Sequence, residues 1–400
     1  MTAESITRPA PPRTAAEILA RARALVPVLQ ERAGEFERLR RLPPDVVELM
    51  RGAGVFRMAF PREFGGPELT SIEQTEVVEA LSYGDASAGW CTHIGACTGL
   101  YASFIAGPAA REMFDGLDLV TAGMLFPVGR AERVPGGYRL TGRWTFGSGV
   151  THSDWVISGA FIYRDGKPDP SPDGRDPHDS RLFMVPRADV EVVDNWHTTG
   201  LAGSGSCDYT ITDVFVPEER TLAFDTVHGR PSPLTSAESF MRTIPGVPLG
   251  VARAALDHVR EIVRTRVDRA TGVPWADNWR MQTTLAACEA DFTASRHGVY
   301  GTMREQWELL SAGSEVPVEL QAALPLARLH AFRTARSIVT RLYDLMQTGS
   351  IHRSGPLDRW LRDTTTMCQH LLAQDRILQS AGAHLLGGTP EFRLCLGITG

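Results

Sequence analysis

The chain has 400 residues, a formal net charge of −6 and an apolar share of 43%, with 22% of its residues charged. These values are ordinary for a soluble globular protein of two or three sub-domains, and they give no reason to expect nucleic acid or an anionic membrane as a partner. No apolar run approaches the roughly 20 residues that cross a bilayer. The six cysteines are widely spaced and form no CxxC pair, which favours a reduced, cytoplasmic chain without a disulfide scaffold or a metal site.

Lysine is almost missing from the sequence. Among 41 basic residues the only lysine is Lys167, which lies in the loop-like stretch YRDGKPDPSPDGR. A pyridoxal-phosphate Schiff base and a P-loop both need a lysine in a structured site, so neither chemistry is expected. The motifs GxGxxG, GxSxG and HExxH are also absent, which argues against classical dinucleotide dehydrogenases, serine hydrolases and zinc hydrolases.

Helical periodicity dominates the first part of the chain. The stretch 14–40 places Ile18, Ala22 and Leu25 four and three residues apart, and PPDVVELMRGAG begins with prolines and ends on glycine. The segments SIEQTEVVEALSYGD and SAGWCTHIGACTGLYASFI predict two further helices, of which the second is apolar nearly all round and therefore buried. We expect an N-terminal helical domain over residues 1–117.

The period then changes to two. Apolar residues alternate in short stretches that Gly, Pro and Asp separate, namely GGYRLTGRWTFGSG, DWVISGAFIYR, RLFMVPRADVEVV and SCDYTITDVFVPEER. This pattern predicts a central β domain over residues 118–225. In its first stretch, the Gly-Ser-Gly sequence at 147–149 interrupts the strand, and glycines weaken a strand unless something must approach the backbone closely.

Long helical segments follow from about residue 236. They begin at GVPLGVAR, WRMQTTLA, PVELQAAL and PLDRWLRD. Four such helices suffice for a bundle, so we expect a C-terminal helical bundle over residues 226–400. The last segment is predicted as one helix that carries Arg359, Asp363 and His370 on one face.

This order of elements, together with four stretches of sequence, resembles the acyl-CoA dehydrogenase superfamily and, within it, the flavin-dependent monooxygenase branch. The stretches are FPREFGGPEL (60–69), GYRLTGRWTFGSGVTHSDWVISGA (137–160), TGLAGSGSCDYTITDVFVPEER (199–220) and PLDRWLRDTTTMCQH (356–370). The resemblance runs over residues 15–390. It implies an α+β fold with an N-terminal helical domain, a central β-barrel or sandwich and a C-terminal four-helix bundle, assembled as a homotetramer.

The resemblance also implies the cofactor and the partners. Such enzymes receive reduced flavin, FMNH2 or FADH2, from a separate NAD(P)H flavin reductase, and they form a flavin hydroperoxide with molecular oxygen. The missing nicotinamide-binding motif agrees with a separate reductase. The implied reaction is hydroxylation of a phenolic or polycyclic small molecule. Oxygenation at nitrogen or sulfur, on an amino sugar or a heterocycle, is an open alternative.

The resemblance indicates Ser148 and His370 as catalytic residues. Ser148 would hold the flavin nitrogen that gains a proton on reduction, and His370 would act as a base or as a stabiliser of the hydroperoxide, because histidine has a suitable intrinsic pKa. Taken alone, the pattern also fits a turn serine and a solvated polar helix face. His93 is a second catalytic and substrate-pocket candidate that could equally be a core histidine, and Trp90 is either core or a pocket wall.

The remaining cofactor contacts are less specific. The strand before Ser148 is implied to run along the flavin ring, the small residues of GLAGSGSCDY could cradle a phosphate or ribityl chain, and two arginines that open helices could meet the phosphate in this chain or across a subunit interface. The cofactor-binding candidates are Trp144, Phe146, Gly147, Ser148, Ser204, Arg253 and Arg280.

A dehydrogenase of this superfamily needs a carboxylate base, which usually follows an Arg-Asp segment in a Tyr-Glu-Gly-Thr stretch. Here the sequence after Asp363 reads TTTMCQH, without a glutamate. This departure favours oxygenation, although Glu238, Asp257 and Glu261 are alternative bases. A helical scaffold that binds a flavin or nothing is the non-enzymatic alternative.

Overall fold

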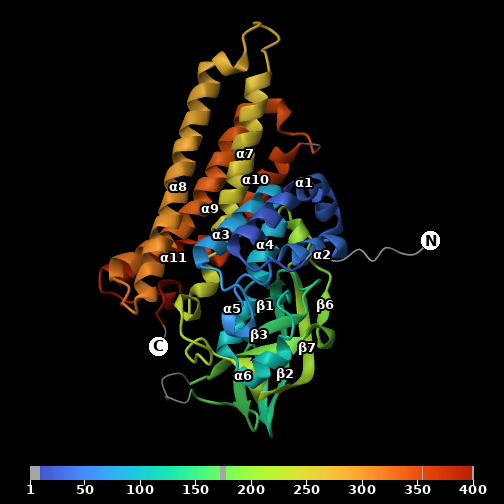
Figure 1. The fold of residues 1–400 in the computed structure, drawn as a ribbon, viewed down its shortest axis with the longest axis vertical. Helices are drawn as coiled ribbons and strands as arrows, with labels where there is room; N and C mark the ends of the chain where they lie inside the picture. The colour runs from blue at the N-terminus through green and yellow to red at the C-terminus, as the bar shows by residue number, and fades with distance from the viewer. Residues whose placement is uncertain (1–9, 172–176, 354, 399–400) are drawn as a thin grey trace, which may run out of the picture.

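The computed structural model describes residues 10–171, 177–353 and 355–398. Helices at the start of the chain, a β-sheet in the middle and long helices at the end follow one another in sequence and occupy separate regions in space (Figure 1). This is the α+β architecture that the sequence predicts. Within the described ranges, none of the helices combines the length and the apolar character that a membrane crossing requires.

Capping residues and a buried apolar stripe set the N-terminal helices. Thr14 and Glu17 form a capping box at the start of α1, and Ile18 and Phe36 are buried along its length. The apolar segment after Asp85 is two helices instead of the one expected, because the Thr98 hydroxyl donates to the Gly95 carbonyl at 2.7 Å, where the helix breaks. The helices are α1 (Ala15–Leu39), α2 (Pro44–Ala53), α3 (Ser71–Gly84), α4 (Ala86–Gly95), α5 (Thr98–Tyr101) and α6 (Gly107–Met113).

The middle region is one eight-stranded sheet in the order β6-β7-β2-β1-β3-β5-β8, with β4 paired to β3. Only β1 and β3 run parallel among the described pairs, and a register shift interrupts their ladder. This sheet forms the central β domain that the sequence predicts. Its strands are β1 (Thr121–Val134), β2 (Gly137–Gly147), β3 (Trp155–Arg164), β4 (Lys167–Pro168), β5 (Ser180–Pro186), β6 (Glu191–Val193), β7 (Cys207–Pro217) and β8 (Thr221–Leu222).

The strands lie inside the range 118–225 predicted for the central domain, and the exact domain boundaries stay predictions. Lys167 belongs to the short strand β4 and is exposed where the chain turns back against β3. The lone lysine therefore stands on the surface of the β region, outside any buried site.

The C-terminal helices are α7 (Gly246–Thr265), α8 (Trp279–Ser311), α9 (Val318–Met346), α10 (Pro356–Met367) and α11 (Asp375–Leu385). The last predicted helix is therefore broken after Met367, and the expected helical face from Arg359 to His370 is wrong at its end. The Gln374 amide donates to the Cys368 carbonyl at 2.7 Å and caps α10. His370 consequently lies on a turn.

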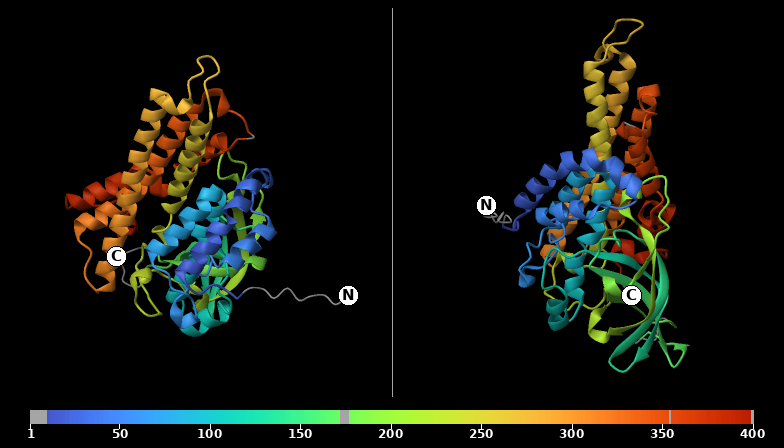
Figure 2. Two further views of the ribbon diagram at one scale, coloured as in Figure 1. Left: turned by 45° about the horizontal axis from the view of Figure 1, so that its top comes forward. Right: turned by 90° about the vertical axis from the view of Figure 1, so that its right-hand side faces the viewer.

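The three regions meet at α4. Helix α3 packs along α7, so the first and last parts of the chain share one core, which includes Val78, Leu81 and Leu256. The sheet lies below α4 and beside α5, and the connection between α7 and α8 projects at the far end from the sheet (Figures 1 and 2).

Candidate active site

Ser148 lies in the turn after β2 and belongs to a chain of three buried serine hydroxyls. Its Oγ is 2.6 Å from Ser206 Oγ, which is 2.7 Å from Ser204 Oγ. Ser204 Oγ donates to the Leu201 carbonyl at 2.6 Å, and the Trp90 indole N–H of α4 donates to Ser148 Oγ at 3.0 Å. The serine turn is thereby fixed to the helical region.

The same tryptophan contacts His370. The Trp90 and His370 rings meet edge to face, with centroids 5.2 Å apart and an interplanar angle of 82°. Ser148 from the β region and His370 from the C-terminal helices therefore share one neighbour on α4. The two residues that the sequence selected lie at one site, and Trp90 joins them there.

His370 is neutral near pH 7 in this structure. Its Nδ1 accepts a hydrogen bond from the backbone N–H of Leu372 at 3.3 Å, so the proton of the neutral ring is on Nε2. Although the residue keeps some solvent contact, the surrounding protein lowers its pKa to about 4. The intrinsic basicity expected from the sequence is thus suppressed, and the ring offers an N–H donor.

His93, also on α4, is buried, and its Nδ1 lies 2.7 Å from Thr243 Oγ1, just before α7. Burial and the nearby His370 lower its pKa to about 3. His93 is therefore a neutral histidine with one nitrogen held by a hydroxyl. This arrangement agrees with the core reading and leaves its second nitrogen for a ligand.

The strand before Ser148 turns out differently from expectation. Trp144 is fully buried, donates to the Gly159 carbonyl at 2.8 Å and stacks on Tyr209 at 5.4 Å, so its side chain belongs to the sheet core and not to a cofactor surface. Gly147 is needed for internal packing as well, because a Cβ there would lie 2.9 Å from the Tyr209 ring. The close approach that requires this glycine is to Tyr209.

Phe146 is the exposed aromatic at this turn. It has a φ of 60°, in the left-handed region, and 60% of its surface is exposed. A register shift between β2 and β7 at this point turns its side chain away from the face that buries Trp144. Its ring meets Trp196 edge to face at 6.2 Å. A strained and exposed aromatic two residues before Ser148 fits a position where a flat ligand covers it.

Ser204 does not offer its side chain to a phosphate. The residue is 1% exposed and its hydroxyl is bonded to Leu201 and Ser206. The loop packs inward, since a Cβ on Gly203 would meet Phe36 at 2.8 Å. The Ser204 side chain therefore reaches the candidate site only through Ser206 and Ser148, and a cofactor contact at this loop stays a prediction.

The two arginines also lie outside the site. Arg253 on α7 is paired with Glu289 and Asp257 at 2.8 Å each, so its charge is already neutralised. Arg280 is exposed in the first turn of α8. This helix begins at the projecting α7–α8 connection, at the opposite end of the molecule from the sheet (Figure 1). Within this chain neither arginine meets Ser148, and only contact with another subunit would bring Arg280 to a flavin.

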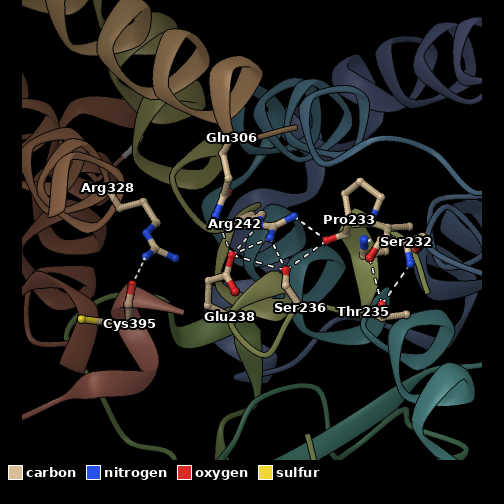
Figure 3. Close-up of polar contacts among 10 residues, drawn as sticks. Ser232, Pro233, Thr235, Ser236, Glu238, Arg242, Gln306, Arg328 and Cys395 are labelled. Atoms are coloured by element: carbon tan, nitrogen blue, oxygen red, sulfur yellow. Dashed lines mark hydrogen bonds and ion pairs between the residues drawn. The ribbon is translucent and has the colours of Figure 1, made fainter. Parts of the chain in front are cut away.

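Of the three alternative dehydrogenase bases, two are bound in ion pairs and the third is exposed on α7. Glu238 is buried, and its Oε1 accepts from Arg242 at 2.5 Å and from Gln306 at 2.7 Å (Figure 3). Burial acts to raise the pKa of Glu238, but the Arg242 guanidinium outweighs it and lowers the pKa overall. Asp257 pairs with Arg253 and Arg260, and Glu261 is exposed on α7. None of the three is a free carboxylate beside Ser148 and His370.

Comparison with known proteins decides the family. Residues 14–109 match the family model "Acyl-CoA dehydrogenase, N-terminal domain", and residues 243–375 match "Acyl-CoA dehydrogenase, C-terminal domain". The chain is 32% identical over 373 residues to indole-3-acetate monooxygenase of Pseudomonas putida, which covers 92% of this chain and 93% of that protein. The chain belongs to the flavin-dependent monooxygenase branch of the acyl-CoA dehydrogenase superfamily.

Solved structures agree with this assignment. The HsaA monooxygenase from M. tuberculosis superposes with a TM-score of 0.86 at 26% identity, covering 96% of this chain and 100% of that chain. XiaF from Streptomyces sp., solved with FADH2 and glycerol, gives a TM-score of 0.85 at 26% identity, with 94% and 96% covered. This monooxygenase is the oxygenase component of a two-component system and uses reduced flavin.

Two residues at the candidate site, Ser206 and Thr243, were missed by the sequence analysis. Ser206 and Thr243 hold Ser148 and His93, and Asp363 accepts a 2.6 Å hydrogen bond from the Leu201 N–H. Burial, reinforced by the nearby Asp85 charge, raises the pKa of Asp363 to about 7. The sequence analysis did indicate Asp363, on one helix face with His370, but the structure bonds its carboxylate to the Leu201 N–H of the serine loop. Within the described residues, no group of three or more His, Cys, Asp or Glu is arranged to hold a metal ion.

Proposed function

We propose that this monooxygenase hydroxylates a phenolic or polycyclic aromatic small molecule at the junction of Ser148, Trp90, His93 and His370. The observation that carries the proposal is the Trp90 indole, which donates to Ser148 and packs against His370. When bound, reduced flavin supplies the activation of molecular oxygen. The residues of the chain hold and enclose the reactants.

Each side chain then has a role that follows from its own chemistry. Ser148 would hold the flavin ring nitrogen, and Phe146 would cover the ring. The neutral His370 would donate its Nε2–H to oxygen or to the substrate, a role that its lowered pKa favours over that of a base. His93, anchored by Thr243, would contact the substrate. Trp90 and Phe146 would exclude water, which otherwise favours release of peroxide.

The test is a product assay with a flavin reductase, NAD(P)H and FMN or FAD, run against a panel of phenols and polycyclic aromatics under ¹⁸O₂. The proposal expects one ¹⁸O atom in an aromatic product. Labelled product only from amines or sulfur heterocycles would assign the alternative N- or S-oxygenation. Peroxide formation with every substrate class would contradict the proposed function.

We further propose that the chain works as a cytoplasmic homotetramer. Exposed apolar side chains support an assembled state, among them Trp279 with 76% of its surface exposed and Val267 with 54%, at the α7–α8 end of the molecule. Light scattering after size-exclusion chromatography measures the assembly. A monomer at micromolar concentration would contradict it.

A further inference from the structure

The hydroxyl hydrogens of Ser148, Ser206 and Ser204 all point in the same direction along their chain of hydrogen bonds. A serine hydroxyl has one hydrogen to donate and two lone pairs to accept. The Leu201 carbonyl can only accept, so the Ser204 hydrogen points to Leu201 across their 2.6 Å contact. Because its only hydrogen is used there, Ser204 must accept in its 2.7 Å contact with Ser206.

The same reasoning passes along the chain to Ser148. The Ser206 hydrogen is directed to Ser204, so Ser206 must accept across the 2.6 Å contact with Ser148. The Ser148 hydrogen therefore points to Ser206. The Trp90 indole N–H, which can only donate, occupies one Ser148 lone pair at 3.0 Å. One lone pair remains on Ser148, and toward any ligand this hydroxyl is purely an acceptor.

The Leu201 end of the chain is held firmly. Leu201 adopts a left-handed φ of 49°, which is unusual for a residue with a branched side chain, and Asp363 binds its N–H at 2.6 Å. The Leu201 carbonyl also accepts from the Trp196 indole at 3.1 Å. Ser204 and Ser206 are 1% and 4% exposed, so water does not compete for their hydrogens.

We infer that Ser204 and Ser206 are positioning residues that make Ser148 a hydrogen-bond acceptor and thereby select reduced over oxidised flavin. This inference rests on the proposed function, in which Ser148 faces the central flavin ring. The central-ring nitrogen of reduced flavin carries a hydrogen and donates. In oxidised flavin the same nitrogen has only a lone pair, which would face the lone pair of Ser148.

The test measures dissociation constants instead of turnover. Oxidised FAD and FMN are titrated in air, and dithionite-reduced FAD and FMN are titrated without oxygen, against the wild-type chain and Ser206→Ala. The variant removes the acceptor of the Ser148 hydrogen, so this hydroxyl can turn toward oxidised flavin. The ratio of the oxidised to the reduced dissociation constant should fall about two- to tenfold, the range of one hydrogen bond. Ser206→Thr, which restores a hydroxyl, should recover the wild-type ratio.

Two further variants separate the outcomes. Ser204→Ala breaks the chain one link further away, should lower the ratio in the same direction, and replaces Ser206→Ala if that variant does not fold. Ser153→Ala removes a buried serine of the same loop that donates to the Val150 carbonyl, and it should leave the ratio unchanged. An unchanged ratio in folded Ser206→Ala or Ser204→Ala overturns the inference. A wild-type chain that binds no reduced flavin overturns the proposed function instead.

Discussion

Two buried polar clusters lie near the core of this monooxygenase, and they differ in what they leave free. The cluster around Glu238 is ionic, with Arg242 and Gln306 bonded to one carboxylate oxygen, and Arg328 nearby donating to the Cys395 carbonyl at 2.9 Å (Figure 3). The cluster around Ser148 is made of neutral hydroxyls, an indole and two neutral histidines. It retains a free lone pair on Ser148 and an N–H on His370.

This difference indicates that the Glu238 cluster is a structural contact, whereas the Ser148 cluster can bind a ligand. Charges that are bonded to each other in the interior hold elements together and change little when a small molecule arrives. Neutral groups with a directed hydrogen-bond order keep an unused donor or acceptor in a fixed direction at low cost. Burial alone would not distinguish the two clusters, because Glu238 and Ser148 are 4% and 7% exposed.

The largest effect is expected from Glu238→Ala. The substitution leaves Arg242 buried without its carboxylate, which typically costs about 3–5 kcal/mol of unfolding free energy. Urea denaturation measures this loss, with Glu261→Ala on the exposed side of α7 as the matched control. The folded fraction should still couple oxygen to hydroxylation. A loss below about 1 kcal/mol would show that the ionic cluster is not a structural contact.

His370→Ala should reduce hydroxylation about a hundredfold, the lower end of what a positioned proton donor or acceptor contributes. Reduced flavin should still be reoxidised, with release of hydrogen peroxide, because the serine turn is untouched. The measurement is the ratio of product to peroxide at equal oxygen consumption. His384→Ala, which removes the α11 histidine bonded to Gln321, is the control. Full coupling in His370→Ala would remove His370 from the site.

Asp363→Asn tests the hydrogen bond by which Asp363 of α10 holds Leu201 in the serine loop. The measurement is the unfolding free energy of the wild type and the variant as a function of pH. The folded-state pKa of Asp363 is raised to about 7, above the ordinary value, so the folded wild type binds more protons between about pH 4 and 7. Its unfolding free energy therefore falls as the pH rises through this window. Because Asn does not titrate, the variant should gain stability relative to the wild type by up to about 1.4 kcal/mol per pH unit. If the unfolding free energies of the variant and the wild type differ by the same amount at every pH, Asp363 is not the carboxyl with the raised pKa.

The smallest effect is expected from Glu261→Gln. This carboxylate is exposed on α7, so the unfolding free energy should stay within about 0.5 kcal/mol of the wild type, and hydroxylation should not change. An assay with acyl-CoA thioesters in place of the aromatic substrate measures any thioester oxidation by the wild type and by the variant. A thioester oxidase activity that Glu261→Gln abolishes would instead support the dehydrogenase alternative.

Much of the fold was accessible from the sequence because periodicity reports which residues are buried. Periodicity does not report what a buried residue touches. The alternation in β2 placed Trp144 on an inward face, but Tyr209 meets it there instead of a flavin. The alternation of apolar residues could not reveal the register shift between β2 and β7 that turns Phe146 outward. The break before α11 escaped detection because side-chain caps from His370 and Gln374 cause it, while the helical spacing continues through the turn.

At the site, the resemblance supplied Ser148 and His370, and the structure brings both to Trp90. Ser206 and Thr243 could not be found in this way, since each acts through a contact between segments far apart in the chain. The lowered pKa of His370 could not be predicted from the sequence either, because it results from the protein that packs around the ring. The direction of the serine hydrogens follows only from the complete set of contacts.

The near-absence of lysine has a practical consequence for experiments on this enzyme. The only side-chain amine stands on β4, at the edge of the sheet and away from Trp90 and His370. Besides the α-amino group of the chain, coupling through amines therefore attaches a dye or a solid support at one defined side chain in the β region. Chemistry aimed at amines therefore leaves every other side chain of the folded protein unmodified, including those expected to handle oxygen.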